Sequence, residues 1–252
     1  MTLIRTLTQI YPQVWRLIAP NPSPMTGPGT NTYFVGSNIH LAIIDPGPAD
    51  DTHLDNIFCA LQTLPAKQHS VMVTHHHRDH AACAQILADR LEVPLLALNA
   101  PFQHEAEYQL ETVTMRVLHT PGHTFVHACY YLIEQRLLLA GDLVAGQGSI
   151  LIVPPDGDMA AYIASLRAVQ SLAPAAILPG HGPVIDNPHE FLQQYINHRL
   201  AREEEVLGWY RKGYTSTEAI AAQIYSDRPE VLKVATMQVE AHLEKLRKEG
   251  RL

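Results

Sequence analysis

The sequence has few cysteines and no long apolar run, and both absences exclude whole classes of protein. Its three cysteines, Cys59, Cys83 and Cys129, form no Cys-x-x-Cys pair, which argues against a disulfide framework and against a cysteine-based zinc site. No apolar run approaches the ~20 residues that span a bilayer, and the N-terminus lacks the pattern of a secretory signal. We therefore expect a cytoplasmic protein that makes no contact with a membrane.

Large aromatic residues are also scarce, whereas histidine is abundant. The chain of 252 residues holds 2 Trp and 5 Phe but 15 His. A net charge of −7 argues against a protein that coats nucleic acid. The fractions of apolar and charged residues are close to those of ordinary globular proteins, which excludes a disordered or fibrous chain. Because histidine is the commonest metal-ligating side chain, a metal enzyme is the first hypothesis.

Strand-like and helix-like segments alternate over the first three quarters of the chain, which predicts an α/β fold with sheets covered by helices. Short runs rich in Val, Ile, Leu and Tyr predict strands at residues 13–19, 31–37, 40–45, 70–75, 94–99, 112–120, 128–133, 136–142 and 175–181. Helices are expected at 51–64, 79–91 and 158–172, the last with Asp158 as its N-cap. The Pro- and Gly-rich residues 20–30 are expected to form a loop.

The strand signal stops near Pro188, where the charge balance also changes. Residues 190–252 carry ten basic and ten acidic side chains, so the excess of negative charge lies before them. Apolar spacing predicts a long helix over 191–207 and a last helix at the C-terminus, and a capping box at 215–218 predicts the start of a helix between them. We expect two domains, residues 1–188 and residues 189–252.

A run of polar side chains from Thr74 to His80 follows one of the predicted strands and precedes a predicted helix. On an extended segment, His75 and His77 project to the same side and His76 to the other. Asp79 and His80 then begin the helix. These imidazoles and the carboxylate form the nitrogen and oxygen ligand set that zinc, iron or manganese accepts.

Three further candidate ligands stand at strand ends, each beside a glycine that permits close approach of backbone and metal. They are His123 in TPGHT, Asp142 in AGD and His181 in PGHG. Each of them alone is more typical of a turn or capping residue. Together with the histidine run, and in this order, they indicate a metal site.

The motifs HxHxDH, TPGHT, AGD and PGHG resemble those of the metallo-β-lactamase-fold hydrolase superfamily over about residues 10–188. The resemblance implies an αββα sandwich with two metal ions. It implies that His75, His77 and His123 hold one ion, that Asp79, His80 and His181 hold the second, and that Asp142 bridges both. Asp79 and Asp142 are the candidate catalytic carboxylates, acting as ligands. Asp45, after the strand at 40–45, is expected to orient the metal-binding loops.

Differences from individual branches of that superfamily narrow the chemistry. Class B β-lactamases often place Cys where Asp142 stands, and glyoxalase II usually has Gly-Gly where this chain has Ala81-Ala82. The segments 179–188, 195–207 and 239–252 are similar to the β-lactamase-like protein 2 subgroup, which has a helical, winged-helix-like tail and includes single-strand endoribonucleases. We therefore expect the sandwich to carry a C-terminal helical, winged-helix-like module.

Two Zn²⁺ ions, with iron or manganese as alternatives, would lower the pKa of a bridging water so that hydroxide attacks a phosphorus or carbonyl centre. Such a site favours a small anionic substrate. The first hypothesis is a phosphodiesterase or endoribonuclease acting on single-stranded RNA, with Lys245, Arg247, Lys248 and Arg251 contacting phosphates. The alternative for these cations is a solvated helix face. The alternative functions are a hydrolase of a thioester, lactone or related ester, and a non-catalytic protein that forms a homodimer through its tail.

Overall fold

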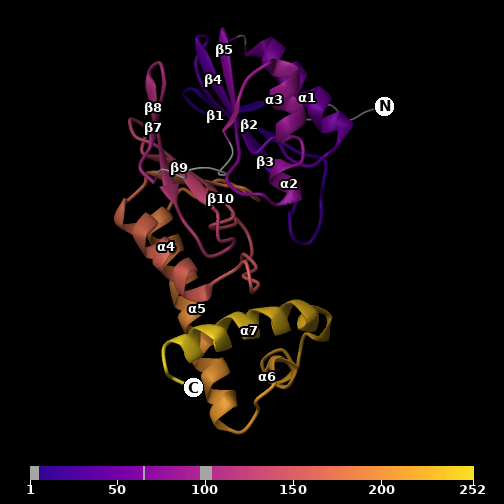
Figure 1. The fold of residues 1–252 in the computed structure, drawn as a ribbon, viewed down its shortest axis with the longest axis vertical. Coiled ribbons are helices and arrows are strands. Elements are labelled where there is room, and N and C mark those ends of the chain that lie inside the picture. The colour runs from indigo at the N-terminus through magenta and orange to yellow at the C-terminus, as the bar shows by residue number, and fades with distance from the viewer. Residues whose placement is uncertain (1–5, 65, 97–103) are drawn as a thin grey trace. The chain divides into compact units, whose positions relative to one another are not determined.

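Two β-sheets form most of the first part of the chain, as Figure 1 shows in the computed structural model, which describes residues 6–64, 66–96 and 104–252. The first sheet has the order β1-β2-β3-β4-β5-β6. Its strands are β1 Thr8–Tyr11, β2 Val14–Ile18, β3 Asn31–Gly36, β4 His40–Ile44, β5 Gln68–Met72 and β6 Leu95–Leu96. Strands β1 to β4 are antiparallel neighbours, whereas β4, β5 and β6 run parallel.

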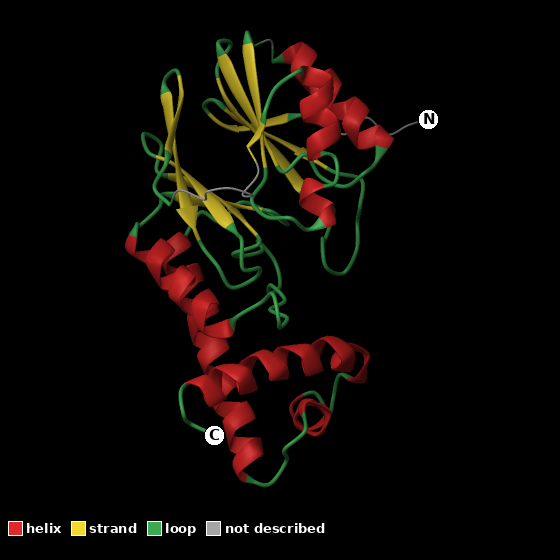
Figure 2. Cartoon of the chain, viewed as in Figure 1, coloured by secondary structure: helices red, strands yellow, loops and turns green. Residues whose placement is uncertain are grey.

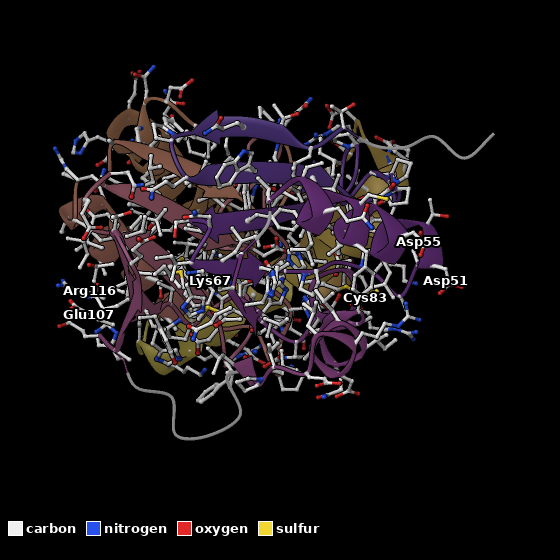
Figure 3. The ribbon with its side chains drawn as sticks, turned by 90° about the horizontal axis from the view of Figure 1, so that it is seen from above. Asp51, Asp55, Lys67, Cys83, Glu107 and Arg116 are labelled. Atoms are coloured by element: carbon white, nitrogen blue, oxygen red, sulfur yellow. The ribbon has the colours of Figure 1, made fainter. Side chains whose placement is uncertain are left out.

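The second sheet has the order β11-β10-β9-β8-β7 and is antiparallel except between β10 and β11. Its strands are β7 Glu107–Leu110, β8 Val113–His119, β9 Ala128–Leu132, β10 Leu137–Gly141 and β11 Ala176–Pro179. At the outer edge an ion pair between Arg116 and Glu107, 2.8 Å long, connects β8 to β7 (Figure 3). The pair is exposed, so its contribution to stability is small.

Apolar side chains from both sheets meet in one core. Alternate residues of β3 and β4 pack with residues of β8, β9 and β10, among them Val35, Ile44, Met115, Tyr130 and Leu139. The opposite side chains of β3 and β4, such as Phe34 and Ile43, pack beneath helices α1 (Asp51–Thr63) and α3 (Ala84–Leu91). Because both faces of these strands are covered, their sequences read as continuous apolar runs.

The predicted helix at 79–91 is divided in the structure into α2 (Arg78–Ala81) and α3. The division lies at Cys83, whose backbone N–H donates to the carbonyl of Gly47 at 3.2 Å. The bond that would continue α2 is therefore replaced by a bond to a distant loop, and the prediction of one helix was wrong. The predicted strand at 94–99 is observed at Leu95–Leu96, and its residues 97–99 lie outside the described part of the chain.

The chain forms two compact units. The first comprises Met1–His119, Val126–Gly148 and Pro174–Asp186 and contains both sheets and α1 to α3. The second comprises Thr120–Phe125, Ser149–Ala173 and Asn187–Leu252. The second unit thus also takes in residues that precede Pro188, and the expected division into domains at 188/189 stays a prediction.

Helices make up the second unit (Figure 2). They are α4 Met159–Ser171, α5 Pro188–Arg211, α6 Thr217–Ile224, a 3₁₀ turn at Pro229–Val231 and α7 Leu232–Lys248. Asp158 caps α4 as predicted, accepting a hydrogen bond from the N–H of Ala161 at 2.9 Å. Helix α6 begins one residue later than the predicted capping box, because Ser216 is its N-cap. Among the described residues, no helix is long and apolar enough to cross a membrane.

Candidate metal centre

Six of the seven predicted ligands lie in the first unit, where loops after strands of both sheets bring them together. His75 and His77 follow β5, and Asp79 and His80 belong to α2. From the other sheet, Asp142 follows β10 and His181 follows β11. Each of these residues leaves the carboxyl end of its strand, so the metal-ligating atoms gather at one end of the two sheets.

His75, His77 and Asp142 form the first group. The Nε2 atom of His75 lies 3.0 Å from Nδ1 of His77 and 3.9 Å from Oδ2 of Asp142. One ligating atom of each of the three lies within 4.8 Å of those of the other two. His75 is buried, at 1% exposure, and Asp142 is buried at 7%. Two nitrogens and a carboxylate oxygen therefore converge in a place shielded from water.

Asp79, His80 and His181 form the second group together with the other oxygen of Asp142. The Nε2 atoms of His80 and His181 are 3.2 Å apart, and each lies 3.4 Å from Oδ1 of Asp142. Oδ2 of Asp79 lies 3.3 Å from Nε2 of His181 and 3.7 Å from Nε2 of His80. Ligands bound tetrahedrally to zinc at ~2.0–2.1 Å stand roughly 3.3 Å from each other. The observed spacing fits a single small divalent ion.

Asp45 and Thr74 fix the imidazoles of both groups. Asp45 accepts hydrogen bonds from the N–H of Thr74 at 2.7 Å and from its hydroxyl at 2.8 Å, and its Oδ2 is 2.8 Å from Nδ1 of His80. Since the Thr74 hydroxyl donates to Asp45, it accepts from Nδ1 of His75 at 3.0 Å. Both rings therefore carry their proton on Nδ1 and turn the Nε2 lone pair toward the ligand groups. The predicted role of Asp45 is confirmed.

Two glycines are required where the loops approach each other. Gly141 has a φ of +47°, and a Cβ there would lie 2.5 Å from Oγ1 of Thr74. A Cβ on Gly180 would lie 2.7 Å from Cε1 of His80 and 2.8 Å from Oδ1 of Asp142. A side chain at Gly180 would displace ligands, and one at Gly141 would displace Thr74, which contacts His75.

The sequence reasoning missed several buried residues beside the ligands. Thr74 is one, and His127 is another: its Nε2 accepts a hydrogen bond from the N–H of Asp142 at 3.1 Å. A hydroxyl residue directly before the first histidine of the motif could have indicated Thr74. Nothing in the local sequence could have indicated His127, because its contact depends on the pairing of β9 and β10.

The charges of the two groups shift the pKa values of their members. Burial raises the pKa of Asp142, but His80 and His181 outweigh this and hold it well below its usual value. Burial lowers the pKa of His181, whereas hydrogen bonds to Asp142 and Asp79 raise it to about 9. Asp142 and Asp79 thus favour a positive charge at the position of the His181 imidazole. A bound metal ion would displace the proton from this imidazole.

The remaining predicted ligand, His123, lies in the second unit. Its Nδ1–H donates to the carbonyl of Leu151 at 2.8 Å, so its Nε2 carries the lone pair in the neutral ring. Its role as a ligand stays a prediction. His76 is exposed, and the centroid of its ring lies 6.5 Å from that of His75, compared with 4.6 Å for His77.

Comparisons with known proteins identify the family of the chain. A family model described as Metallo-beta-lactamase superfamily matches residues 25–99 and 96–181, and one described as Beta-lactamase associated winged helix domain matches residues 216–252. The Beta-lactamase-like protein 2 homolog of Drosophila melanogaster is 32% identical, over 100% of this chain and 94% of its own length. The Atrochrysone carboxyl ACP thioesterase of Aspergillus fumigatus is 32% identical over 79% of this chain and 65% of its own.

A solved structure shows a similar fold over nearly the whole chain. The crystal structure of a Beta-lactamase domain protein from Burkholderia ambifaria has a TM-score of 0.84, with 99% of this chain and 90% of that one covered. The two sequences are 20% identical, so this likeness concerns the fold alone.

Proposed function

The chain belongs to the metallo-beta-lactamase superfamily, with its fold and a C-terminal winged helix domain, and from this premise we propose that it is a hydrolase with two metal ions. The observation that carries the proposal is the position of Asp142 between two ligand groups. Its Oδ2 faces His75, and its Oδ1 faces His80 and His181. One carboxylate can therefore serve both ions.

In this proposal His75, His77 and His123 hold the first ion, and Asp79, His80 and His181 hold the second. The ligand atoms are nitrogens and carboxylate oxygens, which suits zinc and also admits iron or manganese. When bound, two such ions supply an activated water near neutral pH and positive charge for a developing oxyanion. The residues of the chain orient them, because Thr74 and Asp45 fix the tautomers of His75 and His80.

For the substrate we favour a small ester or thioester with an anionic group. Two dications and two carboxylates give the centre a net charge of +2, which attracts anions. The similarity to a protein named as a thioesterase supports acyl chemistry. The ion pairs of the basic residues in α7 and just after it also support acyl chemistry, because these residues already bind carboxylates. Lys245 and Arg251 both donate to Glu203, at 2.9 and 2.7 Å, and Lys248 donates to Asp158 at 2.7 Å.

Cleavage of single-stranded RNA is the second candidate function. It is supported by the match to the winged helix domain and by the full-length similarity to the Beta-lactamase-like protein 2 homolog. Phosphates that bind at the C-terminal end of the chain would compete with the carboxylates that already pair with Lys245, Lys248 and Arg251. Arg247 is exposed on α7 and is the better probe of RNA contact.

A panel of substrates tests the proposal: a glutathione thioester, a lactone, bis-p-nitrophenyl phosphate and single-stranded RNA, each with metal analysis of the protein. We expect hydrolysis of the thioester or lactone, lost in Asp142→Ala and unchanged in Arg247→Glu. RNA cleavage that weakens in Arg247→Glu, with a slope of log affinity against log salt flatter by about 0.7, would favour the second candidate. A metal-loaded protein that hydrolyses none of the four would contradict both.

A further inference from the structure

One residue of the other sheet makes three hydrogen bonds to the turn that carries His181. Asn31, the first residue of β3, donates from Nδ2 to the carbonyl of Pro179 at 2.9 Å and to that of Gly182 at 3.0 Å. Its backbone N–H donates to the carbonyl of Gly180 at 2.8 Å. Asn31 thus binds three of the four consecutive carbonyls of residues 179–182, on both sides of the histidine. Its side chain is buried at 1% exposure.

This connection joins the two halves of the second ligand group. Asp79 and His80 follow β5 of the first sheet, whereas His181 follows β11 of the second. The 3.2 Å separation of Nε2 of His80 and Nε2 of His181 therefore depends on how the sheets are fixed at this end. An isolated β-bridge between Thr30 and His181 brings the same two segments together. Asn31 lies at that junction and holds the turn directly.

We propose that Asn31 is a positioning residue for the second metal ion, which sets His181 at coordinating distance from Asp79 and His80. This inference depends on the proposed two-metal function. It assigns to Asn31 the affinity of the second site, because His75 and His77 of the first group follow β5 and are not part of the His181 turn. The Asn31 side chain touches no ligand atom and acts through the backbone of the His181 turn.

The unequal use of the amide supports a role for its two donors. Oδ1 of Asn31 is buried and has no hydrogen-bond partner, which costs free energy. The amide remains because its NH₂ group can reach two carbonyls that diverge around His181, which a hydroxyl with one proton cannot do.

The matched control is Tyr33, two residues further along β3. Its hydroxyl donates to the same Pro179 carbonyl at 2.8 Å and also contacts the Asn31 side chain, whereas the bonds to Gly180 and Gly182 come from Asn31. Tyr33→Phe therefore removes a buried hydrogen bond at the end of β11 without releasing the turn around His181. Asn31→Leu replaces the amide with two methyl groups on the same branched skeleton, and Asn31→Ala removes both donors without adding apolar atoms.

The experiment measures zinc affinity at both sites by chelator competition, with His181→Ala identifying the second site, and thermal unfolding of each metal-free protein. Outer-shell partners contribute roughly 10–100-fold to metal affinity. We expect that loss at the second site in Asn31→Leu and Asn31→Ala, with the first site unchanged, and little change in Tyr33→Phe.

Three results would overturn the inference. They are unchanged affinity in both Asn31 variants, equal weakening of both sites, and failure of both variants to fold without metal, which would make Asn31 a residue of the fold only. A wild-type protein that binds fewer than two ions would instead contradict the proposed function, and the inference with it. That failure is distinguishable because it is seen before any variant is made.

Discussion

Asp142 is the residue on which the two ligand groups depend, since its oxygens face different groups of histidines. Asp142→Ala removes an anionic ligand from both. We expect the metal content to fall from two ions per chain to one or none. Activity should fall by more than the roughly 10–100-fold loss typical of outer-shell partners. Elemental analysis and turnover of the same preparation check this, and a variant with wild-type turnover would contradict the assignment.

His76 and His77 provide a matched pair of neighbouring histidines. Only His77 places a ring nitrogen beside Nε2 of His75, at 3.0 Å, whereas His76 is exposed. We expect His76→Ala to keep both metal ions and His77→Ala to lose the first. Metal content after dialysis against a weak chelator distinguishes the two variants. Equal losses in both would show that the register assigned to the motif is wrong.

The ligands could be predicted from sequence because His75 to His80 lie on one short turn, and because the other three stand at strand ends beside glycine. Of the residues that contact the ligands or their loops, Asp45 was predicted, whereas Asn31 and His127 could not be. Asn31 and His127 act through backbone groups far along the chain, on Pro179 and Asp142 respectively. These contacts exist only after the sheets have formed. The spacing of residues along the sequence therefore does not predict these contacts.

At the scale of elements, most of the strands that sequence predicted carry buried apolar side chains. Strands β1 and β7 were missed, and both are edge strands with half-exposed, polar sequences. The helix expected at 79–91 was divided for a different reason, since its interruption is a hydrogen bond from Cys83 to Gly47. Periodicity cannot indicate a bond to a residue that lies in another loop.

Helices α5 and α7 are joined by a buried carboxylate with two cationic partners. Glu203 is 1% exposed and accepts hydrogen bonds from Lys245 and Arg251. Burial raises the pKa of Glu203, but contacts with His242 and Lys245 lower it from 4.5 to about 2. A shift of this size corresponds to about 3 kcal/mol of stability.

The sign of the pH dependence follows from that shift. Glu203 binds a proton near pH 4.5 in the unfolded chain but only near pH 2 in the folded chain. The stabilisation from Glu203 is therefore complete above pH 4.5 and is lost as the pH falls toward 2. Urea unfolding of the second unit between these pH values should show the loss. Glu203→Gln should remove that part of the pH dependence, while Glu240→Gln, at an exposed position of α7, should keep it. Identical pH profiles for wild type and Glu203→Gln would contradict the prediction.

At the scale of the whole molecule, the ligands and the helical core are unequally distributed between the units. Six of seven proposed ligands lie in the first unit, whereas the core of α5 to α7 is built from apolar residues such as Val206, Ile220 and Leu243. Metal that binds only the folded protein adds about 4 kcal/mol of stability at a concentration 1,000 times its dissociation constant. That stabilisation belongs to the unit whose unfolding scatters the ligands.

Removal of metal should therefore affect the two units differently. We expect chelation to lower the unfolding temperature of the first unit by several degrees and that of the α5 to α7 core by much less, because that core contains no proposed ligand. Calorimetry reports the heat of both units, and tryptophan fluorescence supplies a separate signal, since Trp15 lies in the first unit and Trp209 in the second. Asp142→Ala is the control, because a protein that has lost one or both ions should respond less to the chelator than wild type does. If the chelator lowers the unfolding temperatures of wild type and Asp142→Ala equally, it acts on something other than the proposed centre. If the first unit of wild type does not respond to the chelator, the ligand groups hold no ion that stabilises the fold.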